Sequence, residues 1–338
     1  MTSSSKNSTS LITKMYSHIY IEKEAENYPV TMRIKGILKC SEIIEITHYK
    51  DVFNERGQDF LMQKNRPKLI LAVKRENLIY KGSPMCNSFG YENFYYTSCV
   101  MNCPYNCEYC YLQGMYPSGN IVVFVNIDDI LESAAKLSKQ KPFICVSYDT
   151  DLLAMEKLLG YAGEWIEFCR QNPEITVELR TKSASFANLA NYAAPANFIL
   201  AITLSPDEII DLYEHKTPKL GRRIEFINHA VKAGWKVRIC LDPVLYVRGY
   251  AQIYRKFIDD VFAKINARDI TDVSFGVLRL PKDFYKRAAK NGVKTELFAY
   301  PFADDSQGAT YSKQHAENLR GVIYGGLLEY MPKGKIFE

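Results

Sequence analysis

Three cysteines lie close together in the first third of the chain and could bind a metal cofactor. Cys103, Cys107 and Cys110 form a C-x3-C-x2-C motif. Thiolates are soft ligands, and three at this spacing can hold three corners of an iron–sulfur cube from one loop. The fourth iron of such a cube stays open to another molecule. The motif therefore predicts a 4Fe-4S cluster with one open coordination site.

A structural zinc site is the alternative interpretation of these cysteines. Cys99 would supply the fourth ligand, because it forms a further C-x3-C pair with Cys103. Structural zinc usually takes two C-x-x-C pairs from separate loops, and this segment holds only one. We therefore favour the iron–sulfur interpretation and expect Cys99 to be a small buried residue.

The composition indicates a folded protein from a reducing compartment. The chain has 338 residues, of which 47% are hydrophobic and 24% charged, and this balance excludes disordered and low-complexity classes. No apolar run reaches the roughly 18 residues of a membrane span, and the N-terminus lacks the apolar core of a signal peptide, so we expect a cytoplasmic location without a membrane partner. Nine cysteines there indicate metal binding or catalysis rather than disulfides. The net charge of +5 permits a nucleic-acid partner without requiring one.

Alternating strand and helix patterns must position the cysteine motif. Short β-branched runs predict six strands, at residues 121–125, 143–146, 175–179, 198–203, 237–241 and 273–278. Amphipathic stretches between them predict helices at residues 128–140, 152–171, 222–233 and 250–267. This alternation indicates an α/β fold with a parallel sheet. Six strands are fewer than the eight of a complete TIM barrel, so we predict a partial (β/α)6 TIM-like barrel.

The remaining segments extend the barrel at both ends. We divide the chain into a flexible arm (1–17), an N-terminal α/β region (18–88), the partial barrel (89–281) and a C-terminal helical and hairpin segment (282–338). The N-terminal region includes a predicted strand at residues 68–73. The C-terminal segment includes a basic run at residues 282–294, a hairpin at 299–310 and a final helix at 313–330.

The cysteine motif, followed by the aromatic Tyr111, resembles the signature of the radical S-adenosylmethionine superfamily. Over roughly residues 18–290 the chain is similar to the spore photoproduct lyase family. The segments that carry this similarity include Leu-Ile-Leu-Ala-Val-Lys74 leading to Cys86, Glu108-Tyr-Cys-Tyr-Leu-Gln113, Val123-Phe-Val-Asn126, Tyr213-Glu-His-Lys-Thr-Pro218 and Arg222-Arg-Ile-Glu225. Cys86 further resembles a cysteine of the clostridial-type members.

The resemblance implies both the cofactors and the reaction. Cys103, Cys107 and Cys110 would bind a 4Fe-4S cluster whose open iron holds S-adenosylmethionine, the source of a 5′-deoxyadenosyl radical. The family repairs the thymine dimer that ultraviolet light makes in spore DNA, the spore photoproduct. The implied partners are double-stranded DNA that carries the lesion and an electron donor such as ferredoxin or flavodoxin, and the implied location is the spore core.

Repair also needs a group that returns a hydrogen atom to the product thymine. Better-known members carry a cysteine just before a Thr/Ser-Asp pair, and aligning Thr150 and Asp151 with that pair puts Tyr148 in its place. Tyr109 and Tyr111 match the family tyrosines that relay the radical, with Cys86 as their partner and Cys145 as a second choice. Ordinary core packing is the alternative for each of the five catalytic candidates, Cys86, Tyr109, Tyr111, Cys145 and Tyr148.

Other candidates would bind S-adenosylmethionine or DNA. The resemblance and the position at strand ends select Tyr109, Asp149, Lys182, Ser205 and Asp242 for the cosubstrate; a solvated lysine and a loop-capping aspartate are the alternatives. His215 is expected to be structural. The candidate DNA contacts are basic residues with one tyrosine between them: Arg222, Arg223, Arg279, Lys282, Tyr285, Lys286 and Arg287. The alternative interpretation is that these charges only face solvent. The hairpin at 299–310 could wedge open the duplex once the lesion is flipped out.

Two other functions stay open at this point. Another radical S-adenosylmethionine enzyme with a different substrate would share the motif, because the motif specifies the cofactor and not the substrate. A nucleic-acid-binding module with a structural cluster is the non-enzymatic alternative. A missing fourth protein ligand argues against it.

Overall fold

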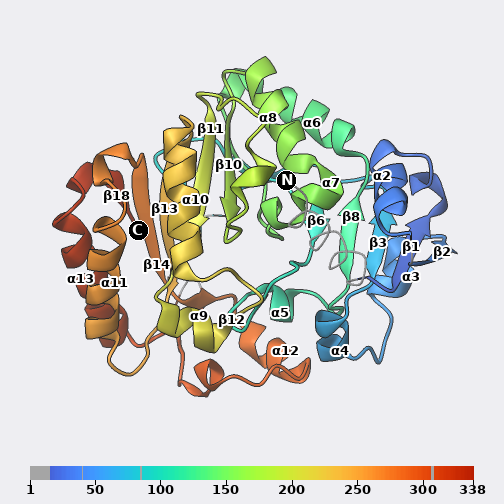
Figure 1. Cartoon of the computed structure of the whole chain (residues 1–338). Helices are drawn as coiled ribbons and strands as arrows, with labels where there is room; N and C mark the ends of the chain where they lie inside the picture. The colour runs from blue at the N-terminus through green and yellow to red at the C-terminus, as the bar shows by residue number, and fades with distance from the viewer. Residues whose placement is uncertain (1–15, 40, 84–85, 306–307) are drawn as a thin grey trace, which may run out of the picture.

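Two main sheets form the framework of the molecule (Figure 1). The computed structural model describes residues 16–39, 41–83, 86–305 and 308–338. The predicted arm therefore lies outside the described residues, apart from Tyr16 and Ser17, and Tyr16 is buried.

The larger sheet is the predicted partial barrel. Within the described residues its strand order is β18 (Ile336–Phe337), β14 (Asp272–Val277), β13 (Lys236–Val244), β11 (Phe198–Thr203), β10 (Thr176–Thr181), β9 (Phe143–Cys145), β5 (Phe94–Tyr96) and β4 (Tyr80–Lys81). All neighbouring strands from β5 to β18 pair in parallel, and only β4 is antiparallel to its neighbour. The consecutive strands β5, β9, β10, β11, β13 and β14 are the six of a partial (β/α)6 barrel, which confirms the predicted fold class.

One of the six predicted strands belongs to the other sheet. The run at residues 121–125 forms β8 (Ile121–Phe124), which pairs with β3 (Leu69–Ala72) and β6 (Val100–Met101). Every residue of β8 is buried, so its sequence indicates a strand covered on both faces but does not identify the sheet. The barrel strand that takes its place, β5, has only three residues and a weak sequence signal.

The smaller sheet has the order β2 (Glu42–Ile46), β1 (His18–Glu22), β3, β8 and β6. Its helices are α2 (Pro29–Ile37), α3 (Tyr49–Phe53) and α4 (Phe60–Asn65). The predicted strand at residues 68–73 is confirmed as β3, which is buried along its whole length in the middle of this sheet. This sheet therefore draws strands from both sides of the cysteine motif.

Helices cover the outer face of the barrel. They are α6 (Ile127–Ala135), α7 (Glu156–Leu159), α8 (Tyr161–Gln171), α10 (Leu220–Lys232), α11 (Tyr250–Phe262) and α13 (Lys313–Leu328). The predicted helix at residues 152–171 is interrupted at Gly160, which takes the left-handed conformation with φ 79° and separates α7 from α8.

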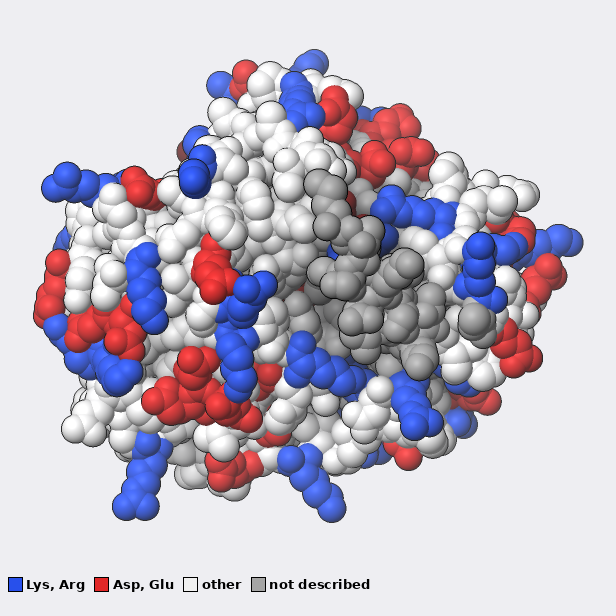
Figure 2. Space-filling model, viewed as in Figure 1, with Lys and Arg blue, Asp and Glu red and all other residues white. Residues whose placement is uncertain are grey.

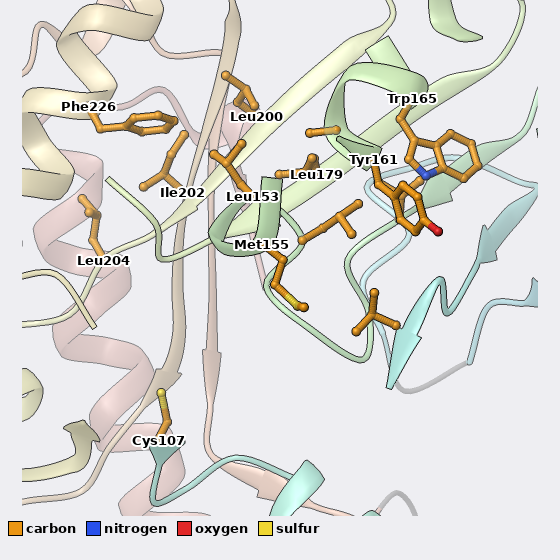
Figure 3. Packing of buried hydrophobic residues seen from close by; sticks show 14 of the residues in the cluster. Cys107, Leu153, Met155, Tyr161, Trp165, Leu179, Leu200, Ile202, Leu204 and Phe226 are labelled. Carbon is orange, nitrogen blue, oxygen red and sulfur yellow. The ribbon is translucent and has the colours of Figure 1, made fainter. Parts of the chain in front are cut away.

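The hydrophobic core lies between the barrel strands and these helices. Figure 3 shows Leu179 of β10 and Leu200 of β11 beside Leu153, with Trp165 of α8 near them. Each such fully buried side chain contributes roughly 1.5–3 kcal/mol to folding. Cys107 belongs to the same cluster but lies at its edge, away from the other labelled residues, so the core supports the cysteine loop from one end (Figure 3).

Short elements close the carboxyl ends of the strands. They are α5 (Leu112–Met115), α9 (Asp207–Tyr213) and α12 (Phe284–Lys290), at the bottom of Figure 1. The predicted hairpin is present as β16 (Ala303–Asp305) and β17 (Gly308–Thr310), and β17 also pairs with β15 (Arg279–Leu280). In the described part of the chain, no helix has the length and apolar character needed to cross a bilayer.

Candidate active site

The cysteine loop is held in place by two contacts from distant parts of the chain. Its strand β7 (Asn106–Cys107) pairs antiparallel with β12 (Glu214–His215). The Lys64 ammonium of α4 donates hydrogen bonds to the carbonyl oxygens of Cys103, at 2.8 Å, and Tyr105, at 3.0 Å. Because Lys64 is buried, these bonds replace the hydrogen bonds that its ammonium would make to water, and they connect α4 to the loop. The loop therefore has a defined shape from the protein alone.

The three thiols of this loop fit an iron–sulfur cluster. Burial raises the pKa of all three, that of Cys103 to about 12, so a cation is needed to keep them as thiolates. Lys64 and Lys182 act in the opposite direction and would balance the negative charge of a thiolate-bound cluster. Within the described residues, no three His, Cys, Asp or Glu side chains are placed to hold a single metal ion. A cube takes its thiolates at separate corners and does not need that convergence.

The position of Cys99 agrees with the expectation of a small buried residue. Its side chain is 1% exposed, and its thiol lies near Lys74, Thr97 and Trp165 in the main core.

A buried ionic network adjoins the loop. The Tyr109 hydroxyl donates to Glu214, and the Ser205 hydroxyl donates to the same carboxylate oxygen at 2.8 Å. The other oxygen accepts from the Arg223 guanidinium at 2.5 Å, and neither side chain of this ion pair is exposed. Lys182 lies with its ammonium 5.6 Å from the centre of the Tyr109 ring. Four predicted site residues therefore meet around Glu214.

The charges of this network hold Glu214 as a carboxylate. Burial alone would raise its pKa, but Lys182, Arg223 and the hydrogen bond from Tyr109 lower it to about 2. A buried carboxylate with this many donors is fixed in position, and it fixes Tyr109 in turn.

The position of Arg223 shows that its predicted contact with DNA is wrong. Its side chain is 0% exposed and also donates to the carbonyl oxygens of Pro218 and Thr203, so it cannot reach a phosphate. The neighbouring Arg222 is 69% exposed and pairs with Glu225 at 2.6 Å. Sequence alone does not distinguish adjacent helix arginines, although their spacing around α10 puts them on different faces.

The structure brings together three of the five candidates for hydrogen-atom return. The Cys86 thiol lies 3.3 Å from the Tyr148 hydroxyl. The Tyr111 hydroxyl donates to the carbonyl oxygen of Tyr148 and lies 3.3 Å from Asp149. The buried Asp149 also accepts from Tyr116 at 3.0 Å. Cys86, Tyr148 and Tyr111 therefore form a continuous line that ends next to Cys110.

The other catalytic and cosubstrate candidates are bonded to other partners, although Cys145 packs against the same hydrophobic cluster as Cys86. Cys145 of β9 donates to Glu178 at 3.5 Å, inside the barrel sheet. Asp242 of β13 is exposed and lies 3.2 Å from Arg180. Tyr109 is bound to Glu214 rather than to the line that contains Cys86.

The helix α12, which carries part of the basic run, lies against α5, the helix that follows the cysteines. Arg287 of α12 donates from Nε to the carbonyl oxygen of Gly114 in α5, at 3.0 Å. A Cβ atom at Gly114 would lie 2.5 Å from the carbonyl oxygen of Phe284, so glycine permits this close approach. Other predicted DNA contacts lie at the surface, with Tyr285 partly buried: Arg279, Lys282 and Lys286 are exposed, and Lys286 pairs with Asp283 at 2.7 Å.

Charged side chains of both signs are mixed on the surface of the molecule. On the face shown in Figure 2, basic side chains are scattered among acidic and neutral ones. The exposed His215 lies 2.6 Å from Glu108, across the β7–β12 pair, which agrees with a structural role.

Comparison with known families identifies the group to which the chain belongs. The family model described as "Spore photoproduct lyase" matches residues 15–304. The chain belongs to the spore photoproduct lyase family. A spore photoproduct lyase of Clostridium acetobutylicum is 26% identical over 271 residues, 76% of each chain. One of Bacillus subtilis is 23% identical over 336 residues, 94% of this chain and 96% of the relative.

Solved structures of the family share the fold. A spore photoproduct lyase complexed with dinucleoside spore photoproduct superposes with a TM-score of 0.79 at 19% identity, covering 96% of this chain and 98% of the other. A doubly substituted lyase with bound AdoMet and dinucleoside spore photoproduct gives 0.80 at 20% identity, covering 95% and 97%. The predicted family and fold class are therefore confirmed.

Several supporting residues of this family member were not predicted. Lys64 lies far from the motif in sequence, and nothing near it indicates that it holds the cysteine loop. The buried Asp151 accepts from the Thr181 hydroxyl and the Lys182 backbone, so it fixes the end of β10. Glu214 was visible only as part of a family-like segment, and a lone glutamate there carries no signal of burial.

Proposed function

We propose that the chain is a DNA-repair lyase that converts the spore photoproduct into two thymines. The single observation that carries the proposal is the loop of Cys103, Cys107 and Cys110, held in place by Lys64 and by the β7–β12 pair, in a member of the spore photoproduct lyase family. The relatives with bound dinucleoside spore photoproduct and AdoMet support the same substrate and cosubstrate here.

The cysteine loop would hold a 4Fe-4S cluster, and Lys182 the cosubstrate. When bound, the cluster and S-adenosylmethionine supply a 5′-deoxyadenosyl radical that removes the hydrogen atom from C6 of the lesion. Lys182 is suited to a carboxylate because it directly follows β10 and its backbone N–H is fixed by Asp151. Asp242, exposed at β13, is suited to ribose hydroxyls. Tyr109, Ser205 and Asp149 are bonded within the protein, so we assign them the positioning of these groups.

Cys86 is the proposed donor of the returning hydrogen atom. Its S–H bond breaks and a C–H bond forms at the methyl radical of the product thymine, which leaves a thiyl radical. The Tyr148 hydroxyl, 3.3 Å away, then gives its hydrogen atom to the sulfur and becomes a tyrosyl radical. Tyr111 holds Tyr148 through its carbonyl oxygen and leads back toward the cluster loop. Cys145 remains the second candidate, although its thiol is bonded to Glu178.

The C-terminal segment, residues 282–338, is the proposed DNA-contacting part, and residues 89–281 the catalytic part. Lys282, Lys286 and Arg279 would contact phosphates, with salt-sensitive binding that does not depend on sequence. The hairpin of β16 and β17 lies next to β15, where it could occupy the gap that a flipped lesion leaves. An electron donor such as ferredoxin or flavodoxin, a cytoplasmic location and a role in spores complete the proposal.

An anaerobic repair assay tests this function. The protein is reconstituted with iron and sulfide, reduced, and given S-adenosylmethionine with dinucleotide spore photoproduct; Cys107→Ala is the control. Formation of thymidylyl-thymidine by the wild type and not by the control supports the proposal. If S-adenosylmethionine is cleaved and the lesion persists, the chain is a radical enzyme with another substrate. If neither reaction occurs with a full cluster, the enzymatic function is refuted.

A further inference from the structure

Three tyrosine rings form a continuous stack that ends at the proposed hydrogen donor. Tyr80 of β4 and Tyr96 of β5 are a directly paired couple across the two strands. Their ring centres lie 4.9 Å apart with an interplanar angle of 11°. Tyr96 in turn stacks on Tyr148, at 4.1 Å and 26°. We call Tyr80, Tyr96 and Tyr148 the tyrosine stack.

The two ends of the tyrosine stack have different neighbours. At the inner end, Tyr148 touches the Cys86 thiol, and its ring centre is 6.1 Å from that of Tyr111. At the other end, Tyr80 lies on β4, the edge strand of the barrel sheet, with the Lys74 ammonium 4.8 Å from its ring centre; like Tyr96 and Tyr148, it is partly exposed. The stack therefore leads from the proposed donor to the edge strand of the barrel sheet, where Tyr80 is its last ring.

Tyr148 is a branch point for a radical that forms on it. Its ring lies closer to Tyr96, in stacked contact, than to Tyr111, which is tilted at 56°. Overlap of stacked rings favours electron transfer between them. Burial and the nearby Asp149 raise the pKa of Tyr80 and Tyr96, so both are protonated phenols with a hydrogen atom to give. Phenylalanine would pack equally well at these positions but has no such hydrogen atom.

We propose that the tyrosine stack is an exit route that carries an unspent radical from Cys86 and Tyr148 to the surface at Tyr80, where a soluble thiol or ascorbate reduces it. The inference rests on the proposed function, because the repair reaction is the source of the radical. The route protects the site when the radical is not returned through Tyr111.

Each transfer along the route moves one hydrogen atom, as an electron between rings and a proton between hydroxyls or through solvent. The O–H bond of Tyr148 forms as that of Tyr96 breaks, and the O–H bond of Tyr96 then forms as that of Tyr80 breaks. The reductant gives its hydrogen atom to Tyr80 and leaves as a thiyl or ascorbyl radical. The protein returns to its starting state.

Trapping of radicals during turnover tests the route. The reconstituted holoenzyme is given S-adenosylmethionine and dinucleotide spore photoproduct with a nitroso spin trap, and trapped residues are mapped by peptide mass spectrometry. The wild type is expected to carry an adduct at Tyr80 that depends on S-adenosylmethionine and on the lesion. Tyr96→Phe keeps the stacked ring but interrupts the hydrogen-atom path, so the Tyr80 adduct should be lost while lesion repair in the same sample continues.

Tyr95→Phe is the matched control. Tyr95 lies next to Tyr96 on β5, and its hydroxyl donates to Gln140 at 2.7 Å, away from the tyrosine stack. This variant should keep the Tyr80 adduct.

Ascorbate gives a second readout. It should increase the number of lesions that the wild type repairs before inactivation, and Tyr80→Phe should lose this benefit while its first-turnover repair stays unchanged.

Four results decide between the possible outcomes. An adduct at Tyr80 that persists in Tyr96→Phe, or wild-type repair without any adduct at Tyr80, overturns the route. Adducts without repair would refute the proposed substrate and leave the route supported. Loss of the Tyr80 adduct in Tyr96→Phe but not in Tyr95→Phe, with repair retained in both variants, supports the route and the proposed function.

Discussion

The buried ion pair between Arg223 and Glu214 leads to a quantitative prediction about folding. Arg223→Met removes the counter-charge of a carboxylate that has no exposed surface and leaves it beside the cysteine loop. Removal of one partner from a buried pair costs about 3–5 kcal/mol of folding free energy. We expect the upper part of that range, because the Arg223 side chain also donates to the carbonyl oxygens of Pro218 and Thr203.

The cost of Arg223→Met should depend on pH in a defined direction. The pKa of Glu214 is about 2 in the folded protein against an ordinary value of 4.5, so its ionised form contributes stability above pH 4.5 that is lost as the pH falls toward 2. Without Arg223, the pKa of Glu214 rises, because burial is then opposed only by Lys182 and the hydrogen bond from Tyr109. Protonation of Glu214 then removes its unpaired buried charge in the folded variant. The loss of folding free energy should therefore be larger at about pH 8 than at about pH 5.

Urea unfolding of the full chain, followed by the fluorescence of the buried Trp165 and Trp235, measures both effects. Arg222→Met is the matched control, and its exposed side chain should change stability by no more than about 0.5 kcal/mol. Equal costs for the two variants, or a cost of Arg223→Met that is the same at both pH values, would refute the buried-pair argument.

Three further predictions follow from the site and its surroundings. Gly114→Ala places a Cβ atom 2.5 Å from the carbonyl oxygen of Phe284, so it should separate α5 from α12 and destabilise the fold by about 1–3 kcal/mol, measured by urea unfolding. Lys282→Ala should weaken binding to DNA of any sequence and reduce the slope of log affinity against log salt by about 0.9, whereas an unchanged slope would exclude a phosphate contact. Cys86→Ala should stop formation of thymidylyl-thymidine while S-adenosylmethionine is still cleaved, and Cys145→Ala should leave repair intact; the opposite pattern would transfer the donor role to Cys145.

Local sequence predicted the elements of the barrel better than their partners. Hydrophobic periodicity identifies a strand, but pairing is decided by contacts across the fold, and the run at 121–125 therefore joined β3 rather than β9. The predicted number of six barrel strands is correct only because β5, which the sequence pattern did not indicate, takes the place of the run at 121–125. Gly160 shows the same limit in a helix, since a left-handed glycine ended an amphipathic pattern that otherwise continues.

Site residues that belong to a sequence motif could be predicted, whereas residues whose role depends on burial could not. The spacing of Cys103, Cys107 and Cys110 was sufficient to predict a cluster-binding loop. Arg222 and Arg223 are chemically identical, and only the packing of α10 shows that one is exposed and the other is buried in an ion pair. Contacts between distant segments, such as those of Lys64 with the cysteine loop, have no local signal at all.

Transfer of a deuterium label tests the central claim, repair of the spore photoproduct by a radical mechanism, most directly. Dinucleotide spore photoproduct deuterated at C6 of the lesion is incubated with the reduced, reconstituted protein and S-adenosylmethionine. Mass spectrometry then follows the deuterium. The account predicts thymidylyl-thymidine as product, with deuterium in the adenosyl group of S-adenosylmethionine or of 5′-deoxyadenosine. Repair without any deuterium in an adenosyl group would contradict it, as would adenosyl cleavage that leaves the lesion and its label intact.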